Sequence, residues 1–317
     1  MTSKDLYRKF CSSEPTIPIF SKDWWLDAIC EDAWDVCIIQ KGDQVVATMP
    51  YFLRKRLGMI AISQPPLTQT LGPWLRPSQA KYAKKLGQEK ELLSALIKKL
   101  PEFAHFYQNW HYSNTNWLPF YWQDFQQTTN YTYRLPDLSD LDMVWAKFKD
   151  NIRREIRKAN NRINLRVRTD LNIDDFLALN VQTFDRQGMS LPYSPELIRR
   201  LDRACIANNA RRIFIAEDEH GKHHAGVYII WDEQSAYYLM GGADPELRSS
   251  GASSLCMWEA IQFSANVTKS FDFEGSMIES VERFFRSFGA VQTPYFSIMK
   301  TPSRLVRLRK CLVNFLR

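Results

Sequence analysis

The chain has 317 residues and a mass of 37.2 kDa, about twice the length of a typical single domain, so two domains are expected. A hydrophobic share of 45% and a charged share of 24% exclude a largely disordered or fibrous chain. The net charge of +7 and the isoelectric point near 9.0 favour an anionic partner, such as a phosphate, a nucleic acid or an acidic membrane face.

The six cysteines are scattered, with no C-x-x-C pair and no metal-ligand spacing. The opening sequence MTSKDLYRKF lacks the apolar region of a secretory signal, so reduced thiols and a cytoplasmic location are expected. The most apolar runs, 225–231 and 236–240, are far shorter than the roughly 20 residues that a membrane span requires.

The first half predicts a helix, a group of strands and a second helix. The proline-rich segment 64–77 is expected to be an irregular loop. The expected elements are a helix at 21–30, strands at 35–40, 44–53 and 57–63, a helix at 79–100, a strand at 103–108, a short helix or loop at 116–126 and a strand at 130–135.

The second half predicts the same order of elements, which indicates duplication of one α/β unit. The expected elements are helices at 141–161, 173–186 and 195–208, strands at 211–217, 224–231 and 235–241, a loop at 242–253, a helix at 254–266, a strand at 269–273, a helix at 279–288 and a strand at 294–300. With a boundary at 134–140, the domains are expected at 1–136 and 137–300, followed by a basic tail at 301–317.

One stretch, 241–254 (GGADPELRSSGASS), joins a predicted strand to a predicted helix and is rich in small residues. Small residues let the backbone approach a bulky anion, and the free N–H groups and positive dipole end of the helix would then point at it. Arg248 would add a charge-assisted contact. A plain helix cap is the structural alternative. The spacing is neither a Walker loop nor a G-x-G-x-x-G fingerprint.

The pattern Arg248-x-x-Gly251-x-Ser253 resembles the Arg/Gln-x-x-Gly-x-Gly/Ala loop of the GCN5-related N-acetyltransferases (the GNAT superfamily), although Ser253 departs from it. More specifically, FDFEGS at 271–276 and FFRSFGA at 284–290 resemble the closing segment of the FemABX-like acyltransferases, and RREIRKA at 153–159 resembles the basic helix of their second domain. The resemblance covers most of residues 140–300.

This resemblance implies an α/β (α+β) fold of two tandem GNAT-like domains, each a mixed, mostly antiparallel sheet flanked by helices. It implies transfer of an acyl group from acyl-CoA (acetyl-CoA) or aminoacyl-tRNA to an amine or hydroxyl of a cell-envelope or polysaccharide precursor, with no metal. The second domain would hold the donor and the first a small-molecule or lipid-linked acceptor. The alternative is an inactive protein of the same fold that binds a nucleotide-like or RNA ligand; DNA is not an expected partner. The implied donor contacts are Arg248, Ser249, Ser250, Gly251, Ala252 and Ser253.

Acyl transfer to an amine needs a group that removes a proton from it. Asp272 and Glu274 alternate along the predicted strand, so they would share one face, and two nearby carboxylates should raise the pKa of one of them. Either is a candidate general base, and Tyr295 is a candidate proton donor to the leaving group. In the structural alternative, Asp272 caps a helix and Glu274 pairs with a basic residue such as Arg283 or Arg286.

The segment 145–168 holds nine basic residues against two acids. Arg153 and Arg157 share one helix face and are candidate contacts for tRNA or another polyanion. The solvated face of an amphipathic helix is the alternative.

Twelve aromatic residues lie within 103–133. Trp117, Tyr121 and Trp122 follow an Asn-Thr-Asn turn and are candidate acceptor contacts. Core packing would explain each of them as well.

His220, His223 and His224 stand beside three acids, but a solvated hairpin is favoured there over a metal site. The tail 301–317 has five basic residues and no acid. Leu305, Leu308, Leu312 and Phe315 would line one helix face, which could either contact an anionic membrane peripherally, at its inner face, or pack on the second domain.

Overall fold

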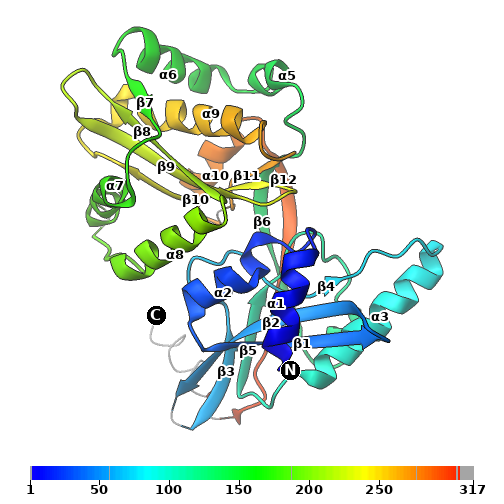
Figure 1. Ribbon diagram of the computed structural model, residues 1–317. Helices are drawn as coiled ribbons and strands as arrows, with labels where there is room; N and C mark the ends of the chain where they lie inside the picture. Colours follow the sequence, from blue (N-terminus) through cyan, green and yellow to red (C-terminus); the bar gives the residue numbers. More distant parts are fainter. Residues whose placement is uncertain (1, 57, 187, 276, 305, 308–317) are drawn as a thin grey trace. The chain divides into compact units, whose positions relative to one another are not determined.

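The computed structural model describes residues 2–56, 58–186, 188–275, 277–304 and 306–307 (Figure 1). The chain forms two compact units, Met1–Asn130 with Pro294–Arg317 and Tyr131–Thr293. Residues 294–300 thus belong with the first unit, whereas the sequence-based division places them in the second. The amphipathic face expected in the tail lies outside the described residues, since Leu305 and 308–317 are not among them.

The first unit is built on a sheet in the order β1-β2-β3-β5-β12, antiparallel except between β3 and β5. The short strand β4, in the segment expected to be irregular, pairs with β2. The elements are α1 (Ser3–Ser13), the 3₁₀ turn η1 (Ile19–Ser21), α2 (Asp23–Cys30), β1 (Trp34–Lys41), β2 (Gln44–Arg56), β3 (Met59–Ser63), β4 (Trp74–Leu75), α3 (Tyr82–Lys99), β5 (His105–Asn109), α4 (Leu118–Tyr121), the start of β6 (Gln126–Leu135) and the end of β12 (Val291–Lys300).

Helix α1 has no counterpart among the predicted elements. Thr2 and Asp5 form a capping box at its start, which satisfies two backbone N–H groups of the first turn. Tyr7, Phe10 and Cys11 follow at helical spacing and are buried, and the Tyr7 hydroxyl donates to the Ser21 carbonyl at 2.7 Å. The capping box and the helical spacing of the apolar residues are both visible in the sequence.

The second unit is built on a sheet in the order β6-β11-β10-β9-β8-β7, antiparallel except between β10 and β11. Figure 1 shows α6 and α9 beside one face of this sheet and α7 and α8 beside the other. Its further elements are α5 (Leu141–Ala146), α6 (Asp150–Asn161), β7 (Arg166–Arg168), α7 (Ile173–Asp185), α8 (Pro195–Ala207), β8 (Arg211–Glu217), β9 (His223–Trp231), β10 (Ala236–Ala243), η2 (Arg248–Ser250), α9 (Ala252–Ser264), β11 (Phe271–Asp272) and α10 (Glu279–Arg286).

Strand β8 shows why this sheet needs helices on both faces. Its central residues 213–216 are all buried, although their side chains alternate between the two faces. Phe214 and Ala216 belong to the core that includes α6 and α9, and Ile215 approaches the side of Gly226 that faces α7. The predicted α/β class, with a mixed, mostly antiparallel sheet flanked by helices, is confirmed.

The single helix expected over 141–161 is two helices, α5 and α6. The backbone N–H of Lys149, between them, donates to the Ser287 carbonyl at 2.9 Å, and Gly289 packs against Lys147. Contacts with a distant segment therefore break a helix that the local pattern would continue. Within the described part of the chain, no helix has both the length and the apolar character needed to cross a bilayer.

Candidate active site

Strands β10 and β11 separate soon after they meet. β11 pairs only with the first two residues of β10, Ala236 and Tyr237. β11 ends at Asp272, and Glu274 and Gly275 then take positive φ values of 62° and 53°, which turn the chain away. Among the described residues, the later part of β10 therefore has no strand partner on this side, and the sheet is splayed there.

Side chains of α7 contact this free edge of β10. The Asn180 amide donates to the Gly241 carbonyl at 2.7 Å, and the Thr183 hydroxyl accepts from the Ala243 N–H at 2.9 Å. A Cβ at Gly242 would lie 2.5 Å from the backbone nitrogen of Asn180, so a glycine is required for α7 to approach this closely. The end of α7 is thus fixed against β10.

Replacing Thr183 by Val should destabilise the protein by about 1–2 kcal/mol, because the Ala243 N–H loses its acceptor. The measurement is the urea unfolding free energy. Thr169→Val is the matched control: Thr169 is exposed in the same unit, so its replacement should stay within about 0.5 kcal/mol of the parent. Equal effects of the two substitutions would contradict the role of Thr183.

The loop after β10 leads into α9 through the turn η2 and Gly251. Gly251 has a φ of 83° and precedes α9 without any side-chain cap. The Ser250 hydroxyl accepts from the Ala252 N–H at 3.3 Å. Within the described residues, the N–H groups of Ser253 and Ser254 have no hydrogen-bond acceptor. The helix begins at 252, two residues earlier than predicted, and its positive end stays open to a ligand.

Helix α6 holds this loop from the other side. A Cβ on Gly251 would lie 2.3 Å from the carbonyl oxygen of Glu155, so backbone packs against backbone here. The Lys158 ammonium donates to the Ser249 carbonyl and lies 3.9 Å from the Glu155 carboxylate. The loop is therefore supported by the basic helix.

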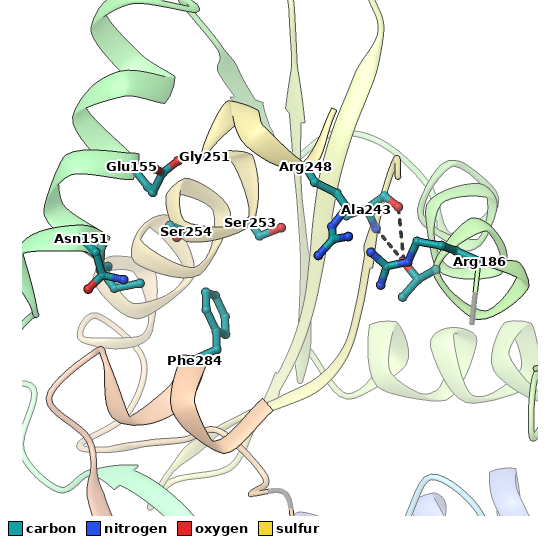
Figure 2. A pocket seen from close by; sticks show the side chains of 11 residues that line it. Asn151, Glu155, Arg186, Ala243, Arg248, Gly251, Ser253, Ser254 and Phe284 are labelled. Atoms are coloured by element: carbon teal, nitrogen blue, oxygen red, sulfur yellow. Dashed lines mark hydrogen bonds between the residues drawn. The ribbon is translucent and has the colours of Figure 1, made fainter. Parts of the chain in front are cut away.

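A cavity of about 400 Å³ lies at this loop. Figure 2 shows Arg248, Gly251 and Ser253 around it, together with residues from α6, α7 and α10. Of the other three predicted donor contacts, Ser250 and Ala252 are buried and Ser249 is exposed, and none of the three lines the cavity. The further lining residues are Asn151, Ile152, Glu155, Thr183, Arg186, Ala243, Ser254 and Phe284.

The two candidate basic residues of α6 differ in their surroundings. Arg153 is partly buried and donates to the Asp150 carboxylate and, at 3.2 Å, to the Ala146 carbonyl. Arg157 is exposed and has no ion-pair partner among the described residues. Neither lines the cavity. Arg157 is therefore the more available of the two to a polyanion.

A hydrogen bond from the Glu274 backbone N–H to the Asp272 side chain joins the two candidate residues. The Asp272 carboxylate is 3% exposed; it accepts from the Glu274 backbone N–H at 2.8 Å and from the Thr132 hydroxyl. Its second oxygen lies 3.9 Å from Arg134 Nε. Neither carboxylate lines the cavity described above.

Both carboxylates hold their protons unusually tightly. Burial raises the pKa of Asp272 to about 6, although the bonds from Thr132 and the Glu274 amide and the charge of Arg134 act in the opposite direction. Burial, and then the charge of Asp272, raise the pKa of Glu274 well above its ordinary value. A carboxyl whose pKa lies nearer neutrality is a better proton acceptor than an ordinary aspartate.

The structure shows other partners for the groups named in the structural alternatives. Ile278, not Asp272, is the residue that precedes α10. The ion pairs of Arg283 and Arg286 are with Glu279 and Glu282 of the same helix, at 3.0 and 2.6 Å. The expected alternation along a strand at 269–274 is also wrong, because β11 ends at Asp272.

The third candidate catalytic residue, Tyr295, is buried and belongs to the first unit, whereas Asp272 and Glu274 belong to the second. Within one unit, the structure therefore brings together only the two carboxylates.

The aromatic residues proposed as acceptor contacts lie at α4 in the first unit. Tyr121 and Trp122 are 59% and 57% exposed, so core packing does not explain them. Trp117 is partly buried and packs edge to face on Tyr121, with ring centroids 5.5 Å apart. Phe120, between them in sequence, is the residue that enters the core. Trp117 also packs against the core of this unit, as the core-packing alternative expects, whereas Tyr121 and Trp122 remain exposed.

The histidines pair with acids along β9 and its turn. His223 lies 3.3 Å from Glu217, and His224 lies 3.1 Å from Asp218. Hydrogen bonds from the Lys222 backbone N–H and from His224 lower the pKa of Asp218 to about 2. No group of three or more metal-binding side chains occurs in the described ranges.

Comparison with known proteins agrees with this geometry. Residues 146–280 match the family model of the acetyltransferase (GNAT) domain. No curated protein matches the chain. The crystal structure of FemX matches with a TM-score of 0.70 and 12% identity, over 93% of this chain and 96% of that one.

Two further solved structures match at low identity. The C-terminal domain of a putative lysylphosphatidylglycerol synthetase from Agrobacterium fabrum has a TM-score of 0.55 at 11% identity, over 98% of this chain and 94% of that one. The L-PGS structure from Bacillus licheniformis has a TM-score of 0.53 at 12% identity, over 90% and 89%. These likenesses show the fold.

Residues 146–280 therefore carry a GNAT-type acetyltransferase domain, and the chain as a whole has the two-unit fold of FemX. The class of enzyme so defined is an N-acyltransferase.

Proposed function

We propose that the second unit binds an acyl donor by its phosphates and transfers the acyl group to an amine or hydroxyl of a cell-envelope or polysaccharide precursor. The donor is acyl-CoA or aminoacyl-tRNA. The observation that carries the proposal is the cavity lined by Arg248, Gly251 and Ser253 at the uncapped start of α9. Unpaired N–H groups and an arginine at one helix end are suited to a phosphate group.

The chemistry proposed for this site is mainly positioning. The neutral amine attacks the thioester or ester carbonyl, and a C–N bond forms. The C–S or C–O bond to the donor then breaks. The amine proton passes to Asp272 or Glu274, directly or through water, and a proton is returned to the departing thiolate or ribose oxygen. The splayed edge of β10 leaves room beside the carbonyl.

The first unit is proposed to bind the envelope acceptor at Trp117, Tyr121 and Trp122. The names of two solved structures of the same fold, lysylphosphatidylglycerol synthetase and L-PGS, support a phospholipid hydroxyl, which would become aminoacylated, as one such acceptor. The proposed location is the cytoplasm, with peripheral contact at the inner membrane face if the acceptor is lipid-linked.

Replacing Trp122 by Ala should raise the KM for the acceptor about tenfold and leave the donor Kd unchanged, because an exposed aromatic platform is lost. The measurement is steady-state kinetics with the acceptor as the varied substrate. Tyr82→Ala is the control, since Tyr82 is 80% exposed on α3 of the same unit and lies outside the candidate surface. An unchanged KM in the Trp122 variant would contradict this acceptor site.

Thermal-shift and native mass spectrometric titrations with acetyl-CoA, longer acyl-CoAs and aminoacyl-tRNA test the proposed function, each followed by an acyl-transfer assay. A true donor at about 100 times its Kd should add roughly 2.7 kcal/mol of stability. Steep salt dependence would indicate tRNA, since its many phosphates release counterions. Binding without transfer to any amine would favour the inactive binding protein, and no binding by any donor would overturn the proposal.

A further inference from the structure

Two arginines from distant parts of the sequence line the same cavity. Arg186 directly follows α7, and Arg248 begins η2. In Figure 2 their guanidinium ends point toward the same space beside β10. Both side chains are exposed, and in the described part of the chain neither has a carboxylate within ion-pair distance.

Several other arginines of this unit, among them Arg168, Arg199, Arg211, Arg283 and Arg286, have a carboxylate within 3.1 Å. Arg186 and Arg248 instead direct their guanidinium groups into one cavity, with no ion-pair partner among the described residues. Two like charges directed into one space repel each other unless an anion lies between them. The pair therefore points to a negatively charged ligand.

The position of Arg186 is fixed independently of the loop that carries Arg248. Its backbone N–H still donates to the Gln182 carbonyl at 3.2 Å, so it continues the last turn of α7. Thr183 lies one turn earlier on the same face and is bonded to Ala243 of β10. The contact of α7 with the splayed edge of β10 thus directs Arg186 toward the cavity.

The one carboxylate among the lining residues does not neutralise this pair. Glu155 lies 3.9 Å from Lys158, which also donates to the Ser249 carbonyl. The two lining arginines outnumber this one carboxylate, and Lys158, which does not line the cavity itself, lies beside the carboxylate. The local charge remains suited to an anion.

We infer that Arg186 is a second cation of the donor site, which together with Arg248 binds a ligand carrying at least two phosphate charges. This inference rests on the proposed function. A pyrophosphate within a coenzyme and adjacent phosphodiesters at an RNA end share this chemistry. A guanidinium can donate two parallel hydrogen bonds to each phosphate group. Arg186 therefore acts as an affinity-determining residue that lies outside the loop motif.

The test compares Arg186→Gln, Arg248→Gln and Arg186→Lys in isothermal titrations of the full chain with inorganic pyrophosphate, coenzyme A and aminoacyl-tRNA. Arg203→Gln is the matched control, because Arg203 is an exposed arginine on α8 that does not line the cavity. Arg186→Gln and Arg248→Gln should each weaken binding about tenfold, the effect of one lost charge-assisted contact. Arg186→Lys, which keeps the charge but loses the two parallel donors, should bind more weakly than the parent and more tightly than Arg186→Gln.

The outcomes separate the inference from the proposed function. If Arg186→Gln binds all three probes as the parent does while Arg248→Gln is weakened, the inference fails and the proposed function stands. If pyrophosphate binding depends on both arginines but no acyl transfer occurs with any donor, the inference stands and the proposed function fails. Absence of binding by all three probes overturns both. The coenzyme A and tRNA titrations identify the source of the phosphates.

Discussion

Replacing Asp272 by Asn is expected to lower kcat at least about a hundredfold while leaving the donor Kd within about threefold, since general bases contribute factors of about 10²–10⁴. Asn retains a side-chain oxygen that can accept from the Thr132 hydroxyl and the Glu274 N–H, so the local hydrogen bonds can survive. The parent kcat should rise as the pH increases through about 6, because only the ionised carboxylate accepts a proton. The variant should lack that rise. Single-turnover rates across pH 5–8 measure both effects.

Glu259→Gln is the control for this experiment. Glu259 is a partly buried carboxyl of α9 whose pKa is also raised by burial, but it lies outside the candidate site. Its replacement should leave kcat and the pH profile unchanged. Full turnover by both Asp272→Asn and Glu274→Gln would contradict the assignment of a general base to this pair and leave the donor site untouched.

Replacing Gly251 by Ala is expected to destabilise the second unit by about 2–4 kcal/mol and to abolish donor binding. The cost has two parts: a φ of 83°, which side chains disfavour, and a Cβ placed 2.3 Å from the Glu155 carbonyl oxygen. Either the loop or α6 must move, and the start of α9 moves with it. Thermal unfolding should shift down by roughly 5–15 °C, and titration with coenzyme A should show no heat.

The substitution Gly221→Ala separates the cost of the positive φ from the cost of the steric clash. Gly221 has a similar φ of 77° in the β8–β9 turn, but nothing lies within 4 Å of the Cβ that it would acquire. This control should therefore lose only about 1 kcal/mol. If the Gly251 variant loses no more stability than the Gly221 variant and still binds donor, the close packing of α6 on the loop is not needed for the site.

The parts of the site that could be predicted from the sequence are those that are contiguous in it. Arg248, Gly251 and Ser253 form one loop motif, and Asp272 and Glu274 lie two residues apart. Arg186 carries no local signal, because only the packing of α7 on β10 brings it to the cavity. Exposure was not predictable either: Phe120 and Tyr121 are similar aromatic neighbours, yet one enters the core and the other remains outside.

The elements predicted from the sequence match the structure where local preference and tertiary packing agree, as in β8 and β9. The exceptions have identifiable causes. Lys149 is bonded to Ser287, which divides one predicted helix into two. The turn at Glu274 and Gly275 shortens the strand expected at 269–273 to the two residues of β11. In the first case a hydrogen bond to a remote segment decides the outcome, and in the second Gly275 packs against the backbone of Tyr131 and Thr132. Neither contact can be read from the local sequence.

The edge of β10 that β11 leaves is held by the side chains of Asn180 and Thr183. Backbone hydrogen bonds between paired strands form with almost any sequence. The side-chain hydrogen bonds from α7 to β10, in contrast, depend on which residues occupy positions 180 and 183. Substitutions at these two positions would therefore change how α7 meets the edge of β10. Because Thr183 and Ala243 both line the cavity, such substitutions would also change the wall of the cavity on that side.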